Sequence, residues 1–282
     1  MSKSSSILQE VESIWNEHME DIEHYSYIIN YKEIHVEKDA DISYSGASMI
    51  KPFILDVIIN KIYEGKIRWT TTYTIKEIHK AAGDGILQYW NLPITFTIEQ
   101  LCHLMITLSD NTATNALIDF LGGTFDVNVS FYELGYIKSH LRSWVGGHDA
   151  DPNINNYIPS SRLSTQNGIS IVNPLEYQKC IRQIVKHPTG YKILTQQQDK
   201  RSLARTDYGY KFAHKTGTAN GTRHDGGILY LPEGKLEVYC FTDGESREES
   251  IDDTACVNMS QSIDDTIYLI LQNTTKRHRY NI

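Results

Sequence analysis

Ser48 and Lys51 are three residues apart at the start of an apolar segment, 50–63, that has helical periodicity. Residues three apart share one face of a helix, so both side chains would lie together if the helix begins close to Ser48. Pro52 is compatible with that start, because proline is tolerated in the first turn of a helix. A serine hydroxyl beside a lysine amine is a nucleophile next to a base, with free helix N–H groups available to an oxyanion. The base must be neutral, which burial or a neighbouring cation such as Lys215 would favour.

Two further polar motifs follow at wide intervals. Ser109-Asp110-Asn111 ends an apolar segment, and all three residue types are also preferred as helix N-caps. Lys215-Thr216-Gly217-Thr218 ends a possible strand and is equally compatible with a polar turn. Each motif alone is weak evidence, as is the Ser48 pattern, because any Ser-capped helix with a lysine in its first turn has it. Their order along one chain is far more specific.

Elements from both ends of the chain are expected to position these motifs. Helical periodicity predicts helices from about residue 6, over 50–63, 97–108 and 113–121, and over 251–271. Runs of β-branched and aromatic residues predict strands at 25–31, 33–37, 211–216, 227–231 and 236–242. Residues 142–173, rich in Gly, Asn, Asp, Ser and Pro, are expected to form a long surface loop. We therefore expect a sheet built from both ends of the chain, terminal helices packed on it, and a mostly helical middle.

Composition limits the partners. The 282 residues include 27 Lys and Arg against 35 Asp and Glu, a net charge of −8, which gives no electrostatic footprint for nucleic acid or an anionic membrane. The hydrophobic content of 40% is ordinary for a soluble protein, and we expect a monomer. The first residues lack an apolar leader, so the chain as written is expected to be cytoplasmic, or secreted if a leader was removed.

The four cysteines are widely spaced and contain no C-x-x-C pair. Neither a zinc site nor a redox motif is indicated, and no cofactor or metal is expected. Buried free thiols are predicted instead, at Cys102, Cys180, Cys240 and Cys256.

The three motifs together resemble those of the penicillin-recognising serine hydrolases, and among them the class A β-lactamases and their relatives. The similarity extends to residues 83–88, to 106–115, and to 221–223 with Asp225. The resemblance implies an α/β (α+β) fold with an antiparallel five-stranded sheet flanked by the N- and C-terminal helices. It also implies an inserted, mostly helical subdomain, 63–204, which with the sheet subdomain, 1–62 plus 205–282, would form one catalytic domain.

By the same resemblance, Ser48 is the nucleophile that attacks a lactam or amide carbonyl, and Lys51 takes its proton. Ser109 passes a proton to the leaving nitrogen. Asn111 binds both Lys51 and the acyl-amide side chain of the substrate. An acyl-serine ester results.

The resemblance also assigns substrate contacts around the third motif. Lys215 sets the local electrostatic field, and Gly217, at the end of the same predicted strand, lies beside the substrate. The backbone N–H groups of Ser48 and Thr218 form the oxyanion hole. Thr216 and Arg223 bind a carboxylate on a small-molecule or peptide-like substrate, although Arg223 would also fit a surface salt bridge.

One residue of the family pattern is missing. Class A β-lactamases have a loop glutamate that activates the water for deacylation, but no glutamate lies between Glu133 and Glu176, and Val145 stands near the expected place. Loss of a general base typically costs about 10²- to 10⁴-fold in rate. The alternatives are therefore a β-lactamase that uses Asp149 or Asp151 as substitute, a D-Ala-D-Ala peptidase-like amidase or esterase, or a penicillin binder with slow deacylation.

Several other polar residues leave their role open. His148, Asp149 and Asp151, with His140 nearby, match no named metal motif and are expected to be solvated. His214 and His224 flank the third motif, where strand packing and pKa tuning are both compatible with their position. By the resemblance, Cys102 stands where some members have half of a disulfide whose other half corresponds to Leu55, so that bridge is not expected.

Overall fold

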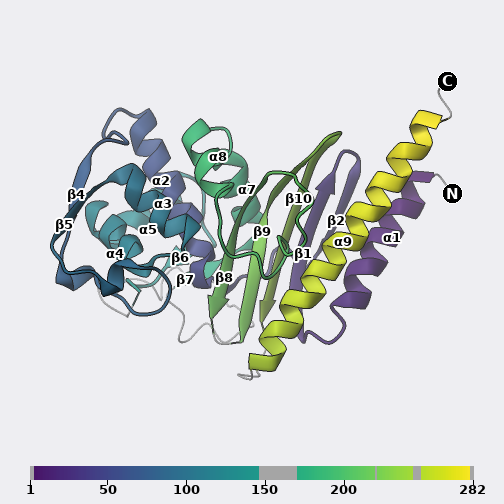
Figure 1. Ribbon diagram of the computed structural model, residues 1–282, viewed down its shortest axis with the longest axis horizontal. Helices are drawn as coiled ribbons and strands as arrows, with labels where there is room; N and C mark the ends of the chain where they lie inside the picture. The colour runs from purple at the N-terminus through teal and green to yellow at the C-terminus, as the bar shows by residue number, and fades with distance from the viewer. Residues whose placement is uncertain (1–2, 146–169, 220, 244–248, 280–282) are drawn as a thin grey trace.

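The computed structural model describes residues 3–145, 170–219, 221–243 and 249–279 (Figure 1). Its main sheet has five strands in the order β2-β1-β10-β9-β8, and every neighbouring pair is antiparallel. The sequence prediction of such a sheet, built from both ends of the chain, is confirmed. The bounds are β1 (His24–Tyr31), β2 (Ile34–Lys38), β8 (Phe212–Ala219), β9 (Thr222–Leu231) and β10 (Gly234–Asp243).

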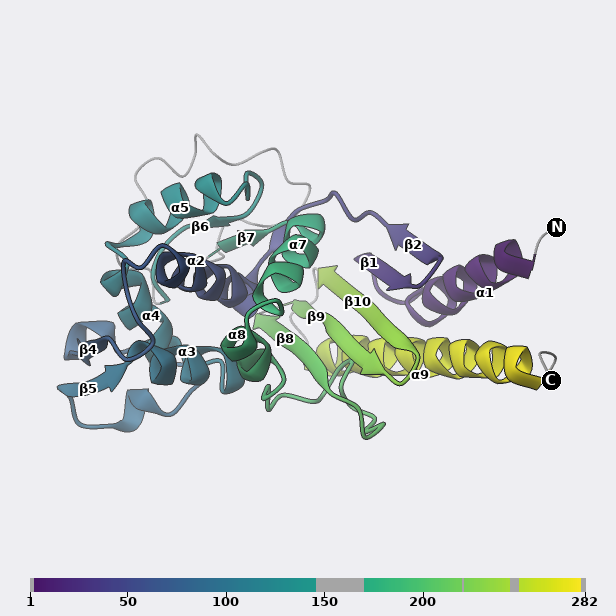
Figure 2. The same cartoon turned by 90° about the horizontal axis from the view of Figure 1, so that it is seen from above.

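Two helices lie side by side along one face of this sheet, α1 (Lys3–His18) and α9 (Glu249–Arg279) (Figures 1 and 2). Alternate strand residues such as Tyr27 and Ile29 pack against them, while Ile28 between them belongs to the core on the other face. Trp15 is buried in this layer, and its indole N–H donates to Thr266 Oγ1 at 3.0 Å. The two terminal helices were predicted, and α9 is longer than the periodicity indicated.

The opposite face of the sheet packs against helices that surround α2 (Lys51–Tyr63) (Figure 2). Residues 51–59 of α2 are all buried, so this helix is buried on every side and runs through the core. The other helices of this region are η1 (Ala47–Ile50), η2 (Glu77–His79), η3 (Leu87–Tyr89), α3 (Ile98–Thr107), α4 (Asn111–Phe120), α5 (Thr124–Glu133), α7 (Pro174–Ile184) and α8 (Pro188–Leu194).

Two small sheets interrupt the region that was predicted to be mostly helical. One pairs β4 (Thr72–Ile75) with β5 (Ile94–Thr97), and the other has the order β3 (Tyr44–Ser45), β7 (Ser170–Val172), β6 (His140–Leu141). The expected loop over 142–173 is therefore wrong at its end, because residues 170–172 form a fully buried central strand. The predicted division into 1–62 with 205–282 and 63–204 stays a prediction.

The four cysteines are buried and free, as predicted. None of the described helices combines the length and the apolar composition needed to cross a bilayer.

Candidate active site

Ser48 lies in the short helix η1, directly before α2, and is 9% exposed. The preceding residue, Ala47, has a φ of 42°, a left-handed conformation that costs free energy in a non-glycine residue. Strand β7 supports this turn, since Ser170 O accepts from Gly46 N at 3.0 Å. A Cβ on Gly46 would lie 2.5 Å from a methyl group of Val172, so only glycine permits that approach. The serine is thus held at the start of a core helix.

Lys51 is fully buried one turn after Ser48. Its Nζ lies 2.6 Å from Ser109 O, 3.0 Å from Ser109 Oγ and 2.8 Å from Asn111 Oδ1. Ser109 Oγ lies in turn 2.9 Å from Ser48 Oγ, so one hydroxyl bridges the Lys51 amine and the Ser48 hydroxyl. Burial lowers the pKa of Lys51 well below its usual value, and the positive charge of Lys215 lowers it further.

The Ser109-Asp110-Asn111 motif joins α3 to α4 and serves two purposes. Asp110 is the N-cap of α4, where its carboxylate accepts from Ala113 N at 2.8 Å, as the capping interpretation expected. Ser109, with a φ of 55°, and Asn111 point to Lys51 instead. Backbone strain of this kind is common where a residue is held for function. The cap therefore positions the two polar side chains beside it.

Lys215 reaches the same place from β8. It is fully buried, and its Nζ donates to Ser109 Oγ at 3.2 Å and to Thr216 O at 2.6 Å. Burial lowers the pKa of Lys215 to about 8, although the negative charges of Asp199, Asp84 and Asp225 act against that shift. A lysine with this pKa keeps its charge at neutral pH.

Gly217 explains how β8 comes so close to Ser48. A Cβ at this position would lie 2.6 Å from Met49 Cγ and 3.2 Å from Met49 N, next to Ser48. A side chain would push the strand away from η1, so glycine is required for close approach of two backbones. Thr216 and Thr218 on either side line the cavity above Ser48.

That cavity has a volume of about 400 Å³ and is open to solvent. Its wall includes Asp84 and residues 197–201, none of which the sequence assigned to the site. Gln198 N donates to Thr107 O at 3.1 Å, which attaches this segment to the end of α3. Arg201 donates to both carboxylate oxygens of Asp199, at 3.0 and 2.9 Å. Asp84 belongs to the 83–88 segment of the family resemblance, which gave it no role, and no periodicity or motif marks residues 197–201, because they meet Ser48 only through tertiary packing.

The sequence model of the beta-lactamase enzyme family matches residues 6–268, which are nearly the whole chain. The chain belongs to this family. The predicted resemblance is therefore confirmed.

Similar proteins agree with this assignment. Beta-lactamase ROB-1 of Haemophilus influenzae is 24% identical over 231 residues, which cover 75% of this chain and 68% of the relative. The structure of a β-lactamase from Sphaerobacter thermophilus superposes with a TM-score of 0.73 at 22% identity, covering 90% of this chain and 95% of that one. A mutant of PBP-A, solved as an acyl-enzyme complex with penicillin G, gives a TM-score of 0.73 at 19% identity, with 93% and 96% covered. The predicted fold class is confirmed.

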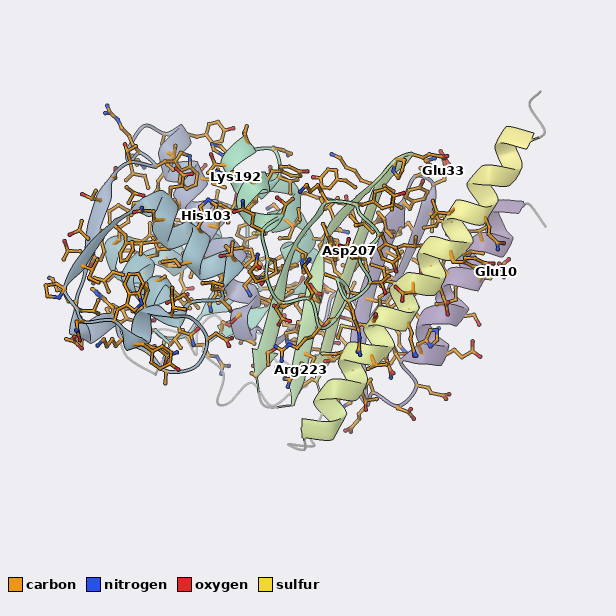
Figure 3. All side chains as sticks on the ribbon, in the orientation of Figure 1. Glu10, Glu33, His103, Lys192, Asp207 and Arg223 are labelled. Atoms are coloured by element: carbon orange, nitrogen blue, oxygen red, sulfur yellow. The ribbon has the colours of Figure 1, made fainter. Side chains whose placement is uncertain are left out.

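In this β-lactamase-family site, Arg223 lies opposite Thr218 in the β8–β9 register. Its guanidinium donates to Ala219 O at 3.1 Å and to Thr222 O at 2.9 Å, at the end of the two strands (Figure 3). The structure thus brings Arg223 beside a cavity residue, with its side chain bound to backbone carbonyls. The family resemblance gave it a carboxylate-binding role, which stays a prediction.

The two histidines beside β8 are both buried. His224 lies 2.8 Å from Ser45 O and accepts from Thr242 N at 3.1 Å, and burial lowers its pKa to about 4. It is therefore a neutral packing residue. His214 contacts Asp225 at 2.8 Å and stacks on Phe212, with ring centroids 4.3 Å apart.

Val145 is held by α4. Asn115 accepts from Val145 N at 2.8 Å and donates to Val145 O at 3.0 Å, one helical turn after Asn111. Val145 stands at the place predicted for the family's glutamate, and two hydrogen bonds thus hold its backbone against α4, the helix that carries Asn111. His148, Asp149 and Asp151 lie outside the described residues. Among the described residues, no group of three or more His, Cys, Asp or Glu side chains is arranged to hold a metal ion.

Proposed function

We propose that the protein is a serine hydrolase that forms an acyl-enzyme through Ser48 with a β-lactam or a related amide. The observation that carries this proposal is the hydrogen-bonded route from Ser48 Oγ through Ser109 Oγ to Lys51 Nζ, at 2.9 and 3.0 Å. It ends on an amine whose pKa is lowered by burial and by a neighbouring cation. Membership of the β-lactamase family supports the same reaction.

In the proposed reaction, the Ser48 proton moves to Ser109 Oγ while the Ser109 proton moves to Lys51. A neutral amine has two N–H groups and one lone pair, so among the three oxygens around it one can donate instead of accepting. Ser48 Oγ forms a bond to the carbonyl carbon, and N–H groups of Ser48 and Thr218 stabilise the oxyanion. Collapse breaks the C–N bond, and the leaving nitrogen takes a proton from Ser109, which Lys51 restores.

Substrate binding would use the charge at β8. Lys215 is a buried cation next to Thr216 and Thr218, which line the cavity, so a carboxylate on the leaving-group side meets short-range charge-assisted hydrogen bonds. These outweigh the screened repulsion of a protein with net charge −8. Arg223 adds a second cation close to Thr218.

A second candidate differs only in the fate of the ester. Val145 offers an apolar side chain where the family has its water-activating glutamate, and Asn115 fixes that backbone from both sides. An acyl-enzyme that lacks this base would hydrolyse slowly, so the protein would act as a covalent penicillin binder. The lifetime of the adduct separates the two candidates.

Intact-mass spectrometry after addition of penicillin G tests both. We expect a mass increase equal to one penicillin in the wild type and in the control Ser130→Ala on α5, and none in Ser48→Ala. An adduct that persists for minutes supports slow deacylation, whereas rapid return to free protein with opened penicillin in solution supports a β-lactamase. An adduct of equal yield in Ser48→Ala, or neither adduct nor product in the wild type, refutes the proposal.

A further inference from the structure

Asp84 is a carboxylate in the cavity wall that the proposed mechanism does not use. Its side chain is exposed, and the residues that the structure describes make no hydrogen bond or ion pair to it. The other carboxylate of the wall, Asp199, differs in this respect. Burial acts to raise the pKa of Asp199, but hydrogen bonds from Arg201 outweigh it and lower that pKa to about 2. Asp84 therefore presents a carboxylate that has no direct ion-pair partner among the described residues, although its charge acts on Lys51 and Lys215 through space.

The backbone around Asp84 is held rigidly against the Ser109-Asp110-Asn111 motif. Asn111 N donates to Asp84 O at 3.1 Å, and Asp110 Oδ2 accepts from Ile86 N at 2.7 Å. Gly85 has a φ of 100°, and a Cβ there would lie 2.3 Å from Asp110 Cγ, so the turn is packed directly on the motif. A rigid support of this kind fixes where the Asp84 charge is presented.

The cavity thus has opposite charges at two places. The β8 side carries the cation Lys215 beside Thr216 and Thr218, and Lys200 also lines the wall. The side formed by the Ser109-Asp110-Asn111 motif carries Asp84, whose backbone carbonyl accepts a hydrogen bond from Asn111 N. In the proposed reaction the leaving group, with its carboxylate, lies toward β8. The acyl side chain lies toward Asn111, which places Asp84 beside the acyl part of the substrate.

We propose that Asp84 binds a cationic group on the acyl side of the substrate, so that this enzyme prefers zwitterionic substrates. The preferred class carries an ammonium group close to the scissile carbonyl and a carboxylate on the leaving side, as an amino-acyl β-lactam or a peptide with a free amine does. The inference rests on the acyl-enzyme function proposed above. An exposed ion pair in a partly enclosed cavity is worth about 2- to 5-fold in rate.

Two penicillins that differ by one amino group provide the probe. Penicillin G has a benzyl side chain, and ampicillin has the same side chain with an α-ammonium group. We would measure the second-order rate constant of acylation for each by intact-mass spectrometry at pH 6.5 and at pH 9. The ratio of ampicillin to penicillin G is the readout, because the titration of Lys51 and Lys215 affects both substrates alike and cancels.

Asp84→Asn removes the charge and keeps the size of the side chain. We expect the ratio at pH 6.5 to fall about 2- to 5-fold relative to the wild type. At pH 9, where an α-amino group is mostly neutral, the wild-type ratio should fall to that of the variant. The matched control is Glu33→Gln, which removes an exposed carboxylate at the β1–β2 end of the sheet, far from Arg223 (Figure 3). Its ratio should equal that of the wild type.

The outcomes separate the two proposals. If both penicillins acylate Ser48 but Asp84→Asn leaves their ratio unchanged, Asp84 does not recognise the ammonium group, while the acyl-enzyme function stands. An equal fall of the ratio in Glu33→Gln would assign the effect to net charge and also refute the role of Asp84. If neither penicillin acylates the wild type, the proposed function fails and this inference fails with it.

Discussion

Replacing Lys215 by methionine should move the acid limb of the pH–rate profile for acylation to higher pH. Acylation requires neutral Lys51, so the rate rises as pH passes through the pKa of that amine. Burial lowers this pKa first, and the charge of Lys215 lowers it further. Methionine keeps the apolar volume but removes the charge, so the pKa of Lys51 rises and the acid limb moves to higher pH.

The size of this effect follows from the geometry. Both amines contact Ser109 Oγ, at 3.0 and 3.2 Å, which places them no more than about 6 Å apart. At an effective dielectric constant of about 20, two unit charges at that distance repel by about 3 kcal/mol. This corresponds to a movement of the limb by about 2 pH units, or less where water screens the pair.

The assay is the second-order rate constant of acylation between pH 5 and 10 for the wild type, Lys215→Met and Lys215→Arg. The wild type should lose rate above about pH 8, where Lys215 loses its charge. Lys215→Arg keeps a charge at all these pH values, so its acid limb should stay in place while the alkaline loss disappears. An acid limb in Lys215→Met that stays in place or moves to lower pH would show that Lys215 does not act on Lys51 through its charge.

Two further changes test the site and its support. Val145→Glu places a carboxylate on the backbone that Asn115 clamps, and we expect deacylation to accelerate about 100-fold. The decay of the adduct by mass spectrometry measures this, and an unchanged lifetime would show that residue 145 does not face the ester. Asp56→Asn should stabilise the fold at pH 8 by up to about 3 kcal/mol and give no gain near pH 4, because burial raises the pKa of Asp56 to about 6 and ionisation above that pH costs stability. Thermal unfolding at both pH values checks this, and an equal effect at both would exclude titration of Asp56 as its cause.

The motifs of the candidate site were predictable because each consists of neighbours in sequence with a local structural reason. Ser48 and Lys51 share a helix start, and Asp110 caps the helix that carries Asn111. The sequence also carries signals for helix α7, which was not among the predicted helices. Asn173 caps α7, Pro174 is its first residue, and buried side chains recur along it at helical spacing at Tyr177, Cys180, Ile181 and Ile184.

Other features depend on contacts between distant segments. Strand β9 begins at Thr222, five residues before the predicted start, because its first residues pair with β8. The sequence did not indicate this start, since polar residues such as Arg223 and Asp225 show no apolar alternation. The two-residue strands β3 and β6 form only because β7 lies between them. Asp84 and Asp199 belong to the cavity for the same reason, since segments far apart in sequence bring them to Ser48.

Helix α4 separates the two halves of the proposed reaction along its axis. Its first residue, Asn111, contacts Lys51, and Asn115, about 6 Å further along the helix axis, binds the backbone of Val145. Substitution at the second turn leaves the first in place. We therefore expect that a change of the side chain at residue 145 alters the lifetime of the proposed acyl-enzyme without moving the groups around Ser48 that would form it.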